Sequence, residues 1–111
     1  MTRSALAALA LLALGTSAAA EEGGALLAYG RHLARECTSC HRPGGEGSAI
    51  PPIAGKAAAE LIELLRSYRE GRKSNPVMVS VAKSLDEDEM AALAAYFASL
   101  PRPPSDASPP R

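Results

Sequence analysis

The feature that most constrains this chain is the run C-T-S-C-H at residues 37–41. Its two cysteines are the only ones in 111 residues, so no thiol is left for another role. A thioredoxin-like dithiol needs a βαβ pattern around it, which this sequence lacks. A structural zinc site needs four ligands, and His32 is the one further candidate beside the three in the motif. A disulfide across two intervening residues would close a small, strained loop.

C-x-x-C-H is the attachment signal for c-type haem. On a helix end, two sulfurs three residues apart reach the two vinyl groups of one porphyrin and form thioethers, and the adjacent histidine directs its imidazole at the iron. We therefore predict one covalent haem c per chain, bound by Cys37 and Cys40, with His41 as an iron ligand. The haem would also enlarge a core that is marginal in a chain with one Phe and no Trp.

The first twenty residues have the order of a secretory signal. A weakly basic start at 1–4 precedes an apolar run at 5–14, and small residues at 18–20 precede Glu21. The run is shorter than the ~20 residues that span a membrane. We expect cleavage after residue 20, export to the periplasm and a mature chain that does not span the membrane. Haem attachment of this kind follows export, so the two predictions support each other.

Charge and composition exclude several classes of function. Twelve basic residues balance twelve acidic ones, which argues against a nucleic-acid-binding protein. Two cysteines cannot build the multi-bridge framework of a small secreted scaffold. We find no internal repeat and no strand pattern of any length.

Helical periodicity runs through the mature chain. The clearest helix begins at a D-x-x-E capping box, Asp86 to Glu89. Gly71 is a suitable C-terminal cap for the helix before it. We predict an all-α fold with helical segments at 26–37, 57–70, 81–84 and 86–100.

Domain boundaries follow from this pattern. One α-helical domain is expected over 21–101, with Gly- and Pro-rich loops at 42–55 and 72–80. The segment 102–111 is rich in proline and poor in apolar residues, so we predict a disordered tail.

Two further segments, added to the haem motif, make the sequence similar to a known family. I-P-P-I-A-G at 50–55 is similar to a P-x-[L/I]-x-G segment, and the stretch 85–100 is similar to a C-terminal helix of the same family. Together with C-T-S-C-H, they resemble the class I c-type cytochromes over residues 26–100. The resemblance implies the class I cytochrome c fold, with three to four helices around one haem. It also implies that the first and last helices cross, with Gly30 and Tyr96-Phe97 at the crossing.

The resemblance also implies methionine as the second iron ligand. Met78 lies in the segment after Asn75-Pro76, which we interpret as a loop between helices. Met90 lies on the apolar stripe of the last helix, where methionine is usually a core residue. We therefore predict Met78 as the ligand. His32 is expected on the polar side of its helix, in contact with solvent.

The same resemblance also implies which residues surround the two iron ligands. A ligating histidine normally donates its other ring N–H to a carbonyl, and the family implies that of Pro51. Ile53 would then press on the haem. Candidates for the haem propionates are Tyr68, Arg72 and Lys73. The predicted cofactor site is thus Cys37, Cys40, His41, Pro51, Ile53 and Met78, with His41 and Met78 on the metal.

His/Met ligation leaves no open position on the iron and raises its reduction potential. We therefore expect a periplasmic one-electron carrier rather than an enzyme, with a dehydrogenase as donor and an oxidase or reductase as acceptor. Segments 50–78 and 95–97 are also similar to the cytochrome subunit of flavocytochrome c sulfide dehydrogenases, whose partner is a flavoprotein. A haem-based gas-binding or peroxidase-like protein is the alternative from another class. A basic cluster at 66–73 is either a partner-docking patch or a solvated helix face.

Overall fold

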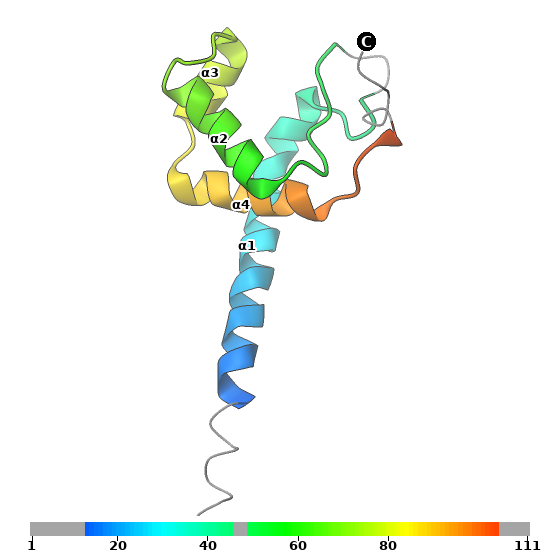
Figure 1. The fold of residues 1–111 in the computed structure, drawn as a ribbon, viewed down its shortest axis with the longest axis vertical. Helices are drawn as coiled ribbons and strands as arrows, with labels where there is room; N and C mark the ends of the chain where they lie inside the picture. The colour runs from blue at the N-terminus through cyan, green and yellow to red at the C-terminus, as the bar shows by residue number, and fades with distance from the viewer. Residues whose placement is uncertain (1–12, 46–48, 105–111) are drawn as a thin grey trace, which may run out of the picture.

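The computed structural model describes residues 13–45 and 49–104, and side chains from residue 18 onward. Within these ranges the regular structure is helical and there is no strand, which confirms the predicted all-α class (Figure 1). None of the helices is long and apolar enough in the described part of the chain to cross a membrane. The four helices are α1 (Ala13–Cys40), α2 (Ala58–Arg69), α3 (Pro76–Lys83) and α4 (Glu87–Ser99).

The core lies where α4 crosses α1, as the resemblance implied (Figure 1). Gly30 is buried at this crossing, and a Cβ placed on it would lie 2.0 Å from the carbonyl oxygen of Ala92. The two backbones therefore meet more closely than any residue with a side chain would permit. Phe97 and Met90 fill the space beside the crossing and are almost fully buried.

Helix α2 closes the other side of the core against α3 and α4. Leu61 and Leu65 are buried on its inner face. Gly71 adopts a φ of 76° directly after the helix, a left-handed conformation that glycine accepts without strain. The predicted cap and the predicted extent of this helix, 57–70, therefore agree with the structure to within one residue.

Helix α3 begins earlier than predicted. The segment around Asn75-Pro76 is the start of a helix rather than a loop, because the Asn75 side chain accepts hydrogen bonds from the backbone N–H groups of Val77 and Met78, both at 3.1 Å. Pro76 occupies the first helical position, where its missing N–H costs nothing. Met78 thus lies in the first turn of α3.

The capping box of α4 is confirmed. The Asp86 carboxylate accepts from the Glu89 N–H at 2.8 Å, and the Glu89 carboxylate accepts from the Asp86 N–H at 3.2 Å. The two side chains satisfy backbone donors that the first turn of a helix leaves free.

Helical structure begins before the predicted first helix, and packed residues continue after residue 101. Residues 21–24 precede the predicted helix at 26–37 but belong to α1, which begins at Ala13. At the other end, Pro103 is buried and a Cβ on Gly55 would lie 2.7 Å from the Cα of Arg102, so residues 102–104 pack against the domain. Most of the predicted leader, 1–12, and the tail from 105 lie outside the described residues. Leader cleavage stays a prediction.

Candidate haem site

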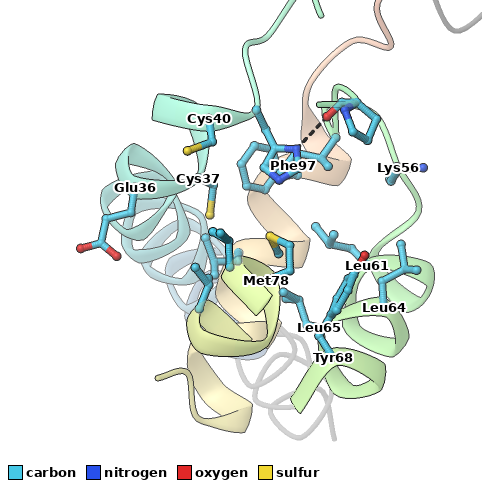
Figure 2. Close-up of a pocket in the computed structure, with 16 residues that line it drawn as sticks. Glu36, Cys37, Cys40, Lys56, Leu61, Leu64, Leu65, Tyr68, Met78 and Phe97 are labelled. Carbon is cyan, nitrogen blue, oxygen red and sulfur yellow. Dashed lines mark hydrogen bonds between the residues drawn. The ribbon is translucent and has the colours of Figure 1, made fainter. Parts of the chain in front are cut away.

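An apolar cavity of about 260 Å³ opens between the end of α1, the loop after it and the faces of α2, α3 and α4 (Figure 2). One water needs only ~10–15 Å³, so this space is no packing defect. All six residues of the predicted site line it. The lining residues are Glu36, Cys37, Cys40, His41, Pro51, Ile53, Lys56, Leu61, Leu64, Leu65, Tyr68, Val77, Met78, Val81, Leu93 and Phe97.

The two cysteines occupy the last turn of α1, and neither forms a disulfide. Their three-residue spacing places both sulfurs on the side of the helix that faces the cavity (Figure 2). Burial raises the pKa of the Cys37 thiol above its ordinary value, and the nearby Glu36 carboxylate adds to the shift. Cys37 is therefore a neutral thiol at pH 7 before any haem is attached.

His41 is held at the exit of α1 by two contacts. Its backbone N–H donates to the Cys37 carbonyl at 2.8 Å, which continues the helical bonding by one residue. Its ring Nδ1 lies 2.7 Å from the Pro51 carbonyl oxygen (dashed line in Figure 2). A carbonyl only accepts, so Nδ1 carries the proton and Nε2 keeps the lone pair that binds a metal.

Met78 projects into the cavity from the first turn of α3. Figure 2 shows its sulfur between the two cysteines on one side and Leu61 and Leu64 on the other. Met90, in contrast, is fully buried among core residues and does not line the cavity. Met78 therefore lines the cavity and Met90 does not, and Met78 belongs to a helix rather than to the predicted loop.

Apart from Tyr68, which was a propionate candidate, the apolar wall opposite the cysteines was not predicted as part of the site. Leu61, Leu64, Leu65 and Tyr68 recur at helical spacing on α2 and line the cavity together. This stripe is visible in the sequence, but periodicity alone does not distinguish a wall that faces a cofactor from one that faces other side chains. Lys56 and Glu36 add charge at the cavity edge, and no sequence signal marked either residue.

One of the three predicted propionate candidates lines the cavity. This is Tyr68. Arg72 instead forms ion pairs with Glu63 at 2.8 Å and Glu70 at 2.9 Å. The Lys73 ammonium lies 5.9 Å from the centre of the Tyr68 ring and outside the cavity lining.

The basic cluster at 66–73 is largely paired within the fold. Arg66 and Arg69 of α2 both donate to the carboxylate of Glu87 at the start of α4. These hydrogen bonds lower the pKa of Glu87 to about 2. Hydrogen bonds from Arg72 likewise lower the pKa of Glu63. With its guanidinium groups engaged in this way, the cluster has little free charge to offer a partner.

The chemistry of these side chains fits haem c. Two thiols, one imidazole with a free Nε2 and one thioether surround an apolar cavity, and all four groups belong to the covalent and axial contacts of a c-type haem. In residues 13–45 and 49–104, no three His, Cys, Asp or Glu side chains gather as they would around a bare metal ion.

Comparison with known proteins agrees with this chemistry. The sequence model of the family described as cytochrome c matches residues 27–101. The "Thiosulfate dehydrogenase electron acceptor" of Stutzerimonas stutzeri (strain A1501) is 41% identical over 96 residues, which cover 79% of this chain and 44% of that protein. "Cytochrome c4" of Azotobacter vinelandii is 35% identical over 58% of this chain and 34% of its own length.

A solved structure shares the fold. The crystal structure of reduced recombinant cytochrome c4 from Pseudomonas stutzeri matches with a TM-score of 0.62 and 31% identity, over 69% of this chain and 49% of that one. The chain thus spans less than half the length of the relatives described here. The family match over 27–101, with the four-helix architecture around the cavity, leads to one conclusion. The chain belongs to the cytochrome c family and is a class I c-type cytochrome, a family that binds haem c covalently.

Proposed function

We propose that this protein is an exported, periplasmic one-electron carrier whose haem iron is bound by His41 and Met78. The observation that supports this most is the fixed tautomer of His41, whose Nδ1 is committed to the Pro51 carbonyl at 2.7 Å. Nε2 is then the free ring nitrogen in a cavity that Met78 enters from another helix.

Each residue has a distinct part in this proposal. Haem c supplies an iron that gains and loses one electron. Cys37 and Cys40 would hold the porphyrin by thioethers, and the Pro51 carbonyl orients the His41 imidazole. The Met78 thioether raises the reduction potential, and so do the leucines of α2 by excluding water. Two protein ligands leave no position for a substrate, which is consistent with a carrier.

The donor is proposed from the relative with the longest match described above. That relative bears the name thiosulfate dehydrogenase electron acceptor and is 41% identical over an aligned region that covers 79% of this chain. We propose a dehydrogenase that oxidises thiosulfate as the donor and an oxidase or reductase as the acceptor. The named relatives favour this carrier over a flavocytochrome subunit or a gas-binding protein. Rapid reduction of the holoprotein by a thiosulfate dehydrogenase in the presence of thiosulfate would support this donor. Absence of reduction under the same conditions would overturn it.

The ligand proposal is tested by two methionine variants. Met78→Ala should open one iron position, so the ferrous protein should bind carbon monoxide at neutral pH while the parent protein does not. Met90→Leu is the matched control, because it removes a thioether from the core at nearly constant volume and should cost less than about 1.5 kcal/mol. Carbon monoxide binding by the parent protein, or an unchanged ferric spectrum in Met78→Ala, would contradict the assignment.

A further inference from the structure

A second concave surface lies on α1, away from the haem cavity. It is a polar groove of about 320 Å³ whose rim includes Arg31, His32 and Arg35. Tyr96 of α4 forms its far side, and the buried Ala34 forms part of its floor. The groove and the haem cavity share no lining residue. At about 3.6 residues per turn, positions 31, 35 and 38 project from the opposite side of α1 to positions 37 and 40.

In the part of the chain that the structure describes, the two arginines of this groove do not form ion pairs that stabilise the fold. Arg31 and Arg35 form no ion pair with any described residue, whereas Arg66, Arg69 and Arg72 are all paired. Lying four residues apart on one helix, the two arginines repel each other. Favourable interaction with the helix dipole does not account for them, because the last turn of α1 has no basic residue.

We propose that this groove docks an acidic segment of a partner protein. Arg and Tyr are the residue types that protein interfaces favour, and both are present here with an imidazole beside them. Leu27 precedes Arg31 by one turn and is 39% exposed, which adds apolar contact area on the same side of α1. A small inorganic anion fits less well, since the three rim side chains are exposed and, among the described residues, no buried side-chain donor is left without a partner to bind it.

Because the groove lies on the other side of α1 from the haem cavity, docking there affects how the protein can exchange electrons. A partner seated behind α1 leaves the mouth of the haem cavity uncovered, so the protein remains bound while its haem exchanges electrons with another molecule. This rests on the proposed carrier function, but the docking itself does not depend on which groups bind the iron.

The test uses the isotope-labelled holoprotein and a hexaglutamate peptide as the probe. Amide shifts should concentrate at residues 28–38 and at Tyr96. Arg31→Gln combined with Arg35→Gln should weaken binding about threefold to tenfold. The matched control, Arg42→Gln with Lys83→Gln, removes the same charge from two exposed residues outside the groove and should leave the affinity within a factor of two.

Three results would overturn the proposal. Shifts centred on the cavity mouth would move the docking site to the haem edge, and equal weakening in both double variants would reduce the binding to net charge. Inorganic phosphate that displaces the peptide at similar concentration would make the groove an anion site instead. The carbon monoxide test of Met78 is read separately, so failure of the groove and failure of the iron ligation are distinguishable.

Discussion

At the crossing of α1 and α4 the chain packs against itself, whereas at the cavity it is shaped to pack against a cofactor. The crossing brings Gly30 against the backbone of Ala92, with Met90 and Phe97 alongside and almost fully buried. A few residues away, α2 and α3 turn leucines, valines and Met78 toward open space. One half of the core is therefore complete in the polypeptide, and the other half is completed only by haem.

The largest effect should come from removal of the covalent attachment. Cys37→Ser with Cys40→Ser leaves the cavity walls without the apolar mass they enclose, so we expect the mature chain to lose its cooperative thermal transition. Circular dichroism during heating would measure this. Ser39→Ala is the control within the same motif, because it removes a hydroxyl that donates to the Glu36 carbonyl at 2.7 Å and approaches the Cys40 sulfur at 3.9 Å, but leaves both thiols in place. A sharp transition in the haem-free double variant would show that the crossing is sufficient by itself.

A smaller effect is expected at the crossing. Gly30→Ala places a methyl group against backbone atoms of α4, which cannot rotate away, and should destabilise the holoprotein by about 1–3 kcal/mol. Gly24→Ala on the same helix meets nothing within 4 Å and should be neutral or stabilising by up to about 1 kcal/mol. Denaturant unfolding of both variants measures the difference. Equal stability of the two would refute the close contact.

The smallest effect concerns acid sensitivity at the α2–α4 junction. The pKa of Glu87 is about 2 in the folded protein, below its ordinary value of 4.5. The ion pairs therefore stabilise the fold above about pH 5, and this contribution is lost as the pH falls toward 2. Glu87→Gln should flatten the decline of Tm over this interval.

Asp88→Asn is the control for that measurement. It removes one charge from the same helical turn at a residue without an ion pair among those described. Its Tm should follow the parent curve between pH 5 and 2. If both variants change the curve alike, general charge rather than the Glu87 pairing governs the acid response.

Much of the fold and site was predictable because local chemistry specified it. The C-x-x-C-H run, the capping box at Asp86 and the cap at Gly71 each depend on neighbours a few residues away. Asn75-Pro76 was misinterpreted because the same pair suits a turn and a helix start, and only the contacts of the Asn75 side chain distinguish them. The role of Arg72 was unpredictable for another reason: one of its two partners, Glu63, lies nine positions earlier within α2, whereas Arg72 follows the end of that helix.

The Gly30–Ala92 contact also bears on the order in which the chain folds. It joins two segments separated by about sixty residues, so a long loop must close before the contact forms. A chain that emerges amino end first cannot make it until α4 has appeared. Cys37 and Cys40 therefore remain accessible through most of that time, in an open chain that a bulky porphyrin can enter. Pulsed alkylation of the two thiols while the exported, haem-free chain folds would reveal that interval directly.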